Sequence, residues 1–210
     1  MKIVLLGPPG AGKGTYAVRL RDKYNLKHIS MGDVIRDQIK KGTEAGLKAK
    51  GYVESGGLVP DDIVVELLKE HLIEVGDDDV LLDGFPRTVE QAKALEGFLK
   101  LDYVFRLKVS QETIIDRLSG RRVCPKCKYV YHLKYIKPKK ESICDYCGSE
   151  LVHREDDKPK AIKDRLETYH KKTEPLINFY KEKKILREVD ADKPIERVDE
   201  IIADFAKVLG

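Results

Sequence analysis

The chain has 210 residues, of which 41% are hydrophobic and 36% are charged, and its formal net charge at pH 7 is +4. This length predicts one domain with a small appendage, because a domain averages about 150 residues. The 40 basic and 36 acidic residues nearly cancel, which argues against a dedicated nucleic-acid-binding protein. No run approaches the ~18 apolar residues that span a membrane, and the first apolar run is too short for a signal peptide. We therefore expect a cytoplasmic protein.

Short apolar runs that alternate with helical patterns run through most of the chain. The continuous apolar character of five runs is typical of strands that are covered on both faces. These runs are residues 2–6, 27–30, 80–83, 103–109 and 185–190. Apolar residues spaced three to four apart predict helices over 14–24, 61–74, 88–100, 111–119, 159–183 and 194–209. The alternation predicts an α/β fold with a mostly parallel sheet.

Two segments interrupt this alternation. Residues 31–59 contain helical patterns and glycines but no strand pattern, and residues 122–153 contain all four cysteines. We interpret both segments as insertions at the ligand-binding edge of the sheet, where they could act as moving lids.

A glycine-rich segment, GPPGAGKGT at residues 7–15, directly follows the first predicted strand. Glycines allow successive backbone N–H groups to point inward and bind phosphate oxygens, and Lys13 adds a positive charge. The general phosphate-loop pattern has Ser or Thr directly after the lysine. Here Gly14 occupies that position, and Thr15 comes one residue later. A simple turn between strand and helix is the alternative. The strand, loop and helix context favours binding of a nucleoside triphosphate.

Arginines lie beside several predicted turns and helix starts. A phosphoryl-transfer enzyme needs such groups, because the guanidinium fork binds phosphate and stabilises the charge of a transferring group. Arg87 follows a predicted strand in the sequence DGFPRT, and Asp83 in the same segment could organise magnesium-bound water. Each arginine could instead be a solvated surface residue, and Gln91 could simply form a helix capping box with Thr88. The arginines are Arg36, Arg87, Arg117, Arg121, Arg122, Arg154 and Arg165.

The cysteines form two C-x-x-C pairs separated by 16 residues. This spacing is typical of a tetrahedral zinc site, and four protein ligands make such a site structural. Two disulfides are the alternative, which a cytosolic location disfavours. A zinc ribbon can also bind nucleic acid, but the lysines of this segment are partly offset by acidic residues. The ligands would be Cys124, Cys127, Cys144 and Cys147.

Over essentially its whole length the chain resembles the adenylate kinases. The phosphate loop has the Gly-Thr ending of that family. Further blocks match in the same order: SMGD at 30–33 with Arg36, GLVPD at 57–61, DGFPRT at 83–88, GRR at 120–122, Arg154 with Asp156 and Asp157, and Arg165.

The resemblance implies a phosphotransferase that moves a phosphoryl group reversibly from MgATP to AMP, giving two ADP and maintaining adenine nucleotide balance. It implies one P-loop kinase domain over 1–210 with a five-stranded parallel sheet flanked by helices. Residues 30–59 would form an AMP-binding insertion and residues 121–158 a zinc-binding ATP lid. We expect a monomer with no nucleic-acid or membrane partner.

Met31 stands where the family commonly has threonine, so a kinase for UMP or CMP is the alternative. A nucleic-acid-binding ATPase is a more distant alternative.

The resemblance also implies roles for individual residues. Mg²⁺ would accompany ATP, and Zn²⁺ would be held by the four cysteines. ATP would contact Gly10, Ala11, Gly12, Lys13, Gly14, Thr15, Arg117, Arg121, Val130, Tyr131 and Lys193. AMP would contact Met31, Arg36, Gly57, Leu58, Val59, Gly84, Phe85, Pro86, Arg87, Gln91, Arg154 and Arg165. The catalytic residues would be Lys13, Arg87, Arg121, Arg154 and Arg165.

Overall fold

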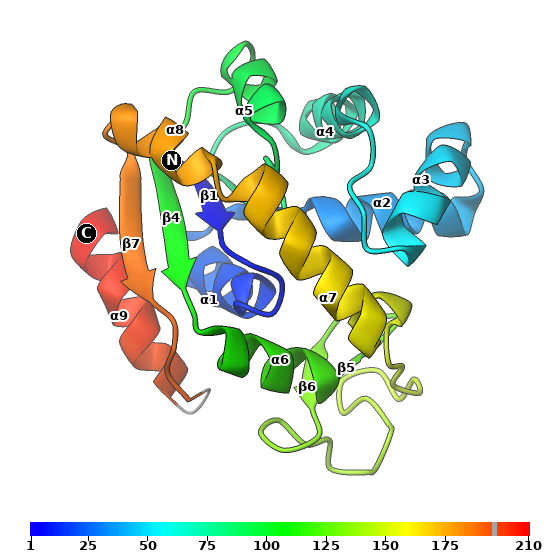
Figure 1. Ribbon diagram of the computed structural model, residues 1–210. Coiled ribbons are helices and arrows are strands. Elements are labelled where there is room, and N and C mark those ends of the chain that lie inside the picture. The colour runs from blue at the N-terminus through cyan, green and yellow to red at the C-terminus, as the bar shows by residue number, and fades with distance from the viewer. Residues whose placement is uncertain (195–196) are drawn as a thin grey trace.

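The computed structural model describes residues 1–194 and 197–210, and its centre is a five-stranded parallel sheet. The order across the sheet is β2-β3-β1-β4-β7, with β1 in the middle (Figure 1). The predicted α/β fold and its parallel sheet are therefore confirmed. The strands are β1 Lys2–Leu6, β2 Lys27–Ser30, β3 Val80–Asp83, β4 Tyr103–Lys108 and β7 Leu186–Asp190.

Helices cover both faces of this sheet, and each face has its own hydrophobic core. Ile3 and Leu5 of β1 pack with α1 and α9, whereas Val4 and Leu6 pack on the opposite face with α4, α5 and α8. Both sets of side chains are therefore buried, which explains the continuous apolar run of the strand. The helices are α1 Lys13–Tyr24, α4 Asp61–Val75, α5 Val89–Glu96, α8 Leu176–Glu182 and α9 Val198–Leu209.

Two further helices, α6 Gln111–Ser119 and α7 Pro159–Thr168, lie beside the phosphate loop and flank the segment that contains the cysteines (Figure 1). A small apolar cluster of Ile114, Leu118, Ile162 and Leu166 joins the two helices. The cysteine-containing segment is thus connected to the sheet through a packed pair of helices.

The two interrupting segments have structures of their own. The first contains α2 Met31–Lys41 and α3 Glu44–Glu54, and no strand lies among them, as predicted. The second contains the antiparallel strands β5 Arg121–Val123 and β6 Val130–His132, followed by the 3-10 helix η1 Glu155–Asp157.

The single helix predicted over 159–183 is wrong. After α7 the chain widens into a π-helical turn, η2 Tyr169–Thr173, and α8 begins only after Pro175. Proline has no N–H, and its ring displaces the carbonyl of the preceding turn, so an unbroken α-helix cannot continue through it. The N–H of Glu174 bonds to the carbonyl of Tyr169 at 2.9 Å, which is the wider spacing of a π-turn.

Two other helix predictions have different boundaries. The helix predicted over 88–100 ends at Glu96, because Gly97 follows and the next amides make turn hydrogen bonds. The last helix begins at Val198 rather than 194, and residues 195–196 lie outside the described residues. Among the described helices, none combines the length and apolar character needed to cross a membrane.

Candidate active site

The phosphate loop connects the carboxyl end of β1 to the first turn of α1. Gly10 and Gly12 have φ values of 81° and 90°, a conformation that favours glycine. A Cβ added at Gly10 would lie 2.9 Å from Cγ of Leu118, so this close approach also requires glycine. No side chain caps the N-terminus of α1, so its first N–H groups are available to bind an anion.

Lys13 and Asp83 place opposite charges beside this loop. The ammonium of Lys13 donates hydrogen bonds to the carbonyls of Gly7 and Pro8, at 2.8 and 2.9 Å. Burial lowers the pKa of Lys13 to about 8, and the charge of Arg87 lowers it further while Asp83 opposes the shift. Burial works to raise the pKa of Asp83, but His28 and Lys13 outweigh it and the pKa is lowered. The carboxylate is therefore ionised at neutral pH.

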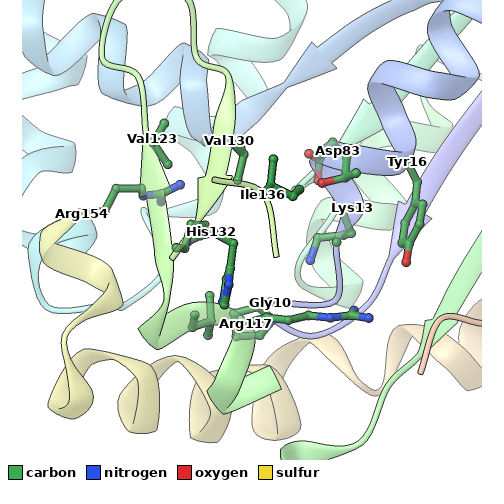
Figure 2. Close-up of a pocket in the computed structure, with 18 of the residues that line it drawn as sticks. Gly10, Lys13, Tyr16, Asp83, Arg117, Val123, Val130, His132, Ile136 and Arg154 are labelled. Atoms are coloured by element: carbon green, nitrogen blue, oxygen red, sulfur yellow. The ribbon is translucent and has the colours of Figure 1, made fainter. Parts of the chain in front are cut away.

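A cavity of about 750 Å³ extends from the phosphate loop to the strands β5 and β6. Lys13 and Asp83 lie on one side of it and Arg154 lies on the other (Figure 2). Predicted site residues that line it are Gly10, Gly12, Lys13, Gly14, Thr15, Arg36, Gly84, Arg87, Arg117, Arg121, Val130, Tyr131, Arg154, Arg165 and Lys193.

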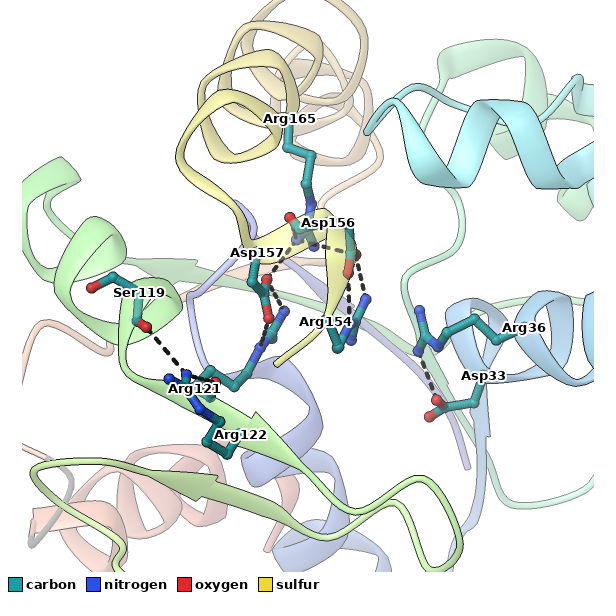
Figure 3. Close-up of polar contacts among 9 residues, drawn as sticks. All are labelled: Asp33, Arg36, Ser119, Arg121, Arg122, Arg154, Asp156, Asp157 and Arg165. Atoms are coloured by element: carbon teal, nitrogen blue, oxygen red, sulfur yellow. Dashed lines mark hydrogen bonds and ion pairs between the residues drawn. The ribbon is translucent and has the colours of Figure 1, made fainter. Parts of the chain in front are cut away.

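Two neighbouring aspartates position three of the arginines (Figure 3). The carboxylate of Asp157, whose side chain is 0% exposed, accepts two hydrogen bonds from Arg121, at 2.5 and 2.7 Å. It also accepts one from Arg165 at 3.0 Å. Asp156 binds Arg154 in the same two-bond manner and lies 3.2 Å from Arg165. The guanidinium groups of Arg121, Arg154 and Arg165 therefore converge, although like charges repel each other.

Burial lowers the pKa of Arg165 to about 10, against the attraction of Asp156. Burial acts to raise the pKa of Asp156, but the charges of Arg165 and Arg154 outweigh it and hold that pKa well below its usual range. The cluster thus combines the ionised carboxylate of Asp156 with a concentration of positive charge, which suits a polyanionic ligand.

A smaller cavity of about 60 Å³ lies between α2, the loop before α4 and the segment after β3. The arginines Arg36, Arg87, Arg154 and Arg165 line both cavities. Other predicted residues that line the smaller one are Gly57, Leu58, Val59, Gly84 and Gln91.

Arg87 and Gln91 are fixed by local hydrogen bonds. The guanidinium of Arg87 donates to the carbonyl of Gly84 at 2.7 Å, and Thr173 donates to the carbonyl of Arg87 at 2.8 Å. Thr88 caps α5 by accepting from the N–H of Gln91 at 3.0 Å, as the capping-box pattern predicts. The Gln91 side chain departs from that pattern. A capping box would have it accept from the N–H of Thr88, whereas it accepts from the N–H of Arg87 at 2.7 Å.

Several predicted residues have their side chains away from the cavities. Ala11, Met31 and Phe85 are at most 1% exposed and belong to the hydrophobic cores. Tyr131 lines the larger cavity, but it is 1% exposed and packs in a small core with Cys124 and Cys144. Pro86 lines a separate small cavity of about 70 Å³ beside the phosphate loop.

Arg117 and Lys193 both line the larger cavity and are joined by a hydrogen bond. The Arg117 guanidinium donates to the carbonyls of Ala191 and Lys193, at 3.0 and 2.8 Å. These bonds connect α6 to the segment after β7 and fix the Arg117 side chain beside the cavity.

The four cysteines come together in space. Their sulfur atoms all lie within 4.8 Å of one another, and the distances from Cys124 to Cys147 and from Cys127 to Cys144 are 3.3 and 3.5 Å. A tetrahedral ion with zinc–sulfur bonds of ~2.3 Å places sulfur atoms at about this separation. All four are free thiols, which contradicts the disulfide alternative.

Sequence reasoning did not assign a role to Asp156, Asp157 or Lys128. The sequence did contain a signal for the two aspartates, which closely follow Arg154. Arginines that converge on one site repel each other, so nearby carboxylates are needed to hold them together. Lys128 gave no comparable signal, since its partner Asp37 is 91 positions away.

A phosphate loop, a parallel sheet and arginines shared by two adjoining cavities define a P-loop phosphotransferase. A sequence model of the adenylate kinase family matches residues 5–185. The chain is 48% identical to an adenylate kinase of Clostridium beijerinckii, and the match covers 100% of this chain and 99% of that protein. It is 46% identical to the adenylate kinase of Lachnospira eligens, with 100% of both chains covered. The chain belongs to the adenylate kinase family, a family of nucleoside monophosphate kinases.

Proposed function

We propose that this protein transfers a phosphoryl group reversibly from MgATP to AMP and so forms two ADP. The observation that carries the proposal is that Arg36, Arg87, Arg154 and Arg165 line both cavities. Two nucleotides bound with their phosphates toward these shared arginines would have the donor and acceptor groups adjacent. The match to the adenylate kinase family and the two relatives named adenylate kinase support the same assignment.

The larger cavity is proposed to hold ATP within a single P-loop kinase domain, residues 1–210. Its triphosphate would bind the backbone of residues 10–15, with Lys13 at the transferred group and Arg121 beside it. The adenine would stack on Arg117 near the backbone of Val130, Tyr131 and Lys193. Residues 121–158 would act as the ATP lid.

The smaller cavity is proposed to hold AMP, with residues 30–59 as its mobile insertion. Arg36 and Arg87 would bind the AMP phosphate, while the base would lie against Gly57, Leu58 and Val59 and contact Gln91. Met31, Phe85 and Pro86 would support this site from the core and the turn, through packing and backbone atoms.

The transfer itself needs no strong base, because a phosphate oxygen of AMP is already an anionic nucleophile. The residues would act by alignment and by charge: Lys13, Arg87, Arg121, Arg154 and Arg165 would stabilise the negative charge of the transferring group. Closure of the two insertions would exclude water, which would otherwise accept the phosphoryl group.

Magnesium would enter with ATP as part of the substrate. The ionised carboxylate of Asp83 and the hydroxyl of Thr15 offer the oxygen ligands, direct or through water, that this ion prefers. The ion would neutralise phosphate charge during the transfer.

The four cysteines are proposed to bind one structural zinc ion. The separations of their sulfur atoms fit one tetrahedral ion. Four thiolate ligands fill the coordination of zinc and leave no position for a substrate, which makes the site structural. A lid with so small an apolar core gains its rigidity from such an ion. We further propose a monomeric, cytoplasmic enzyme whose partners are ATP and AMP rather than nucleic acid or membranes.

A monophosphate panel tests the proposed function. ATP is offered with AMP, UMP, CMP or GMP, and ADP formation is followed. We expect AMP to be preferred by at least about tenfold in kcat/KM. Equal turnover of UMP would contradict the proposal and favour a UMP or CMP kinase.

A further inference from the structure

Two hydrogen bonds determine which way the side-chain amide of Gln91 faces. Its nitrogen Nε2 donates to Oδ1 of Asp61 at 2.7 Å, and its oxygen Oε1 accepts from the N–H of Arg87 at 2.7 Å. A carboxylate can only accept and a backbone N–H can only donate. The orientation of the amide is therefore imposed by its two partners.

Asp61 is itself held in place. Its second oxygen, Oδ2, accepts from the hydroxyl of Thr88 at 3.0 Å, and Thr88 accepts in turn from the N–H of Gln91. Asp61 is also the first residue of α4, where the helix dipole favours a negative charge. Gln91 is 2% exposed, so water has little access to these two hydrogen bonds if the amide turns over. A turned amide would place its oxygen against the Asp61 carboxylate.

These two bonds use one N–H and one oxygen lone pair of the Gln91 amide, which leaves it one more of each, and the residue lines the smaller cavity. Adenine presents an amino donor at position 6 beside an acceptor at N1, which complements that pair. Hypoxanthine has nearly the same shape but presents an acceptor at position 6 and a donor at N1. An amide that could turn over would bind either base, whereas a fixed amide binds one of them.

We propose that Asp61 is a specificity-determining positioning residue, which fixes the Gln91 amide and so makes the site select 6-aminopurine over 6-oxopurine monophosphates. This inference rests on the proposed function, because it requires the base of the monophosphate to occupy the smaller cavity. Asp61 does not contact the base itself; it acts through Gln91.

The test is the Asp61→Asn variant, assayed with ATP and either AMP or IMP. An asparagine can turn its own amide to donate to a reversed Gln91, so the penalty on the wrong orientation is reduced. We expect the ratio of kcat/KM for AMP to that for IMP to fall about tenfold, since a hydrogen bond to a charged group is about twice as strong as a neutral one. Asp62→Asn is the matched control, because Asp62 is exposed in the same helical turn. Its ratio should equal that of the parent.

Gln91→Leu sets the lower limit of the ratio, because it removes the amide altogether. An unchanged ratio in Asp61→Asn, including an equal loss of both activities, would overturn the inference, since a purely structural role lowers both alike. A parent protein that does not phosphorylate AMP would instead overturn the proposed function, and this inference with it. The two failures are distinguishable because the second is observed before any variant is made.

Discussion

The ammonium of Lys128 lies 2.9 Å from the carboxylate of Asp37, and this ion pair joins the two inserted segments. Lys128 lies between β5 and β6, whereas Asp37 is on α2. The side chains are 37% and 48% exposed, so the pair contributes about 1 kcal/mol or less and is weakened by salt. It is a modest connection between segments that are proposed to move.

Lys128→Ala should raise the KM for both nucleotides by up to about fivefold at low ionic strength, because the two inserted segments lose this contact. Steady-state kinetics at about 0.02 M and about 1 M salt would measure the effect, which should disappear at high salt. Lys126→Ala is the control, since Lys126 is an exposed lysine of the same loop. Equal effects of the two substitutions would show that general lid charge, and not the ion pair, is responsible.

The lowered pKa of Lys13, about 8, predicts a pH dependence of ATP binding. The free protein loses the Lys13 proton as pH rises through about 8, whereas a bound triphosphate favours the charged form. ATP binding should therefore take up protons between about pH 8 and 9 and weaken as pH increases further. Calorimetry in buffers of different ionisation enthalpy measures this uptake.

Lys13→Met should remove that proton uptake and reduce phosphoryl transfer by at least about a thousandfold, because a charge-stabilising donor is lost. The folded state should be retained. A variant that turned over at the parent rate would show that the phosphate loop does not bind the transferred group.

Asp157→Asn should lower the free energy of unfolding by about 3 kcal/mol, since Arg121 and Arg165 would be left with a neutral partner at a buried site. Urea denaturation measures the change. Glu155→Gln removes a charge from the same 3-10 helix at an exposed position and should cost little. A similarly small cost for Asp157→Asn would mean that the arginines do not depend on this carboxylate.

Metal analysis should find about one zinc per chain, and its removal by a chelator should lower the melting temperature. The physical reason is that binding free energy at a structural metal site adds to the stability of the folded state. Adding zinc back should restore the parent protein but not Cys144→Ser, which lacks a ligand. An unaltered melting temperature after complete metal removal would contradict the structural zinc.

The central sheet could be predicted closely because its strands are buried on both faces. The run at 80–83, for example, has a hydrophobic pattern that neither a turn nor an exposed helix explains, and it forms β3. The helix predicted over 159–183 failed for a local reason that the sequence did contain, namely Pro175. Apolar spacing continues on both sides of that proline, so periodicity alone does not indicate the π-turn.

The contacts of the candidate site were less accessible to prediction. A capping pattern explained Gln91 locally, but its bond to Asp61 joins residues 30 positions apart. Asp61 at a helix start has a sufficient local explanation in the helix dipole, so nothing in the sequence indicated a second partner. Pairings of this kind depend on how α4 packs against α5, and only the folded chain brings them together.

The most direct test of the account is the stoichiometry of the reaction, measured by chromatographic separation of the nucleotides. Mixing ATP, AMP and Mg²⁺ with the protein should yield two ADP for each ATP consumed, with no inorganic phosphate. ADP alone should return ATP and AMP in equal amounts. Release of phosphate from ATP at a rate independent of AMP would contradict the account, because it would identify a hydrolase and not a phosphotransferase.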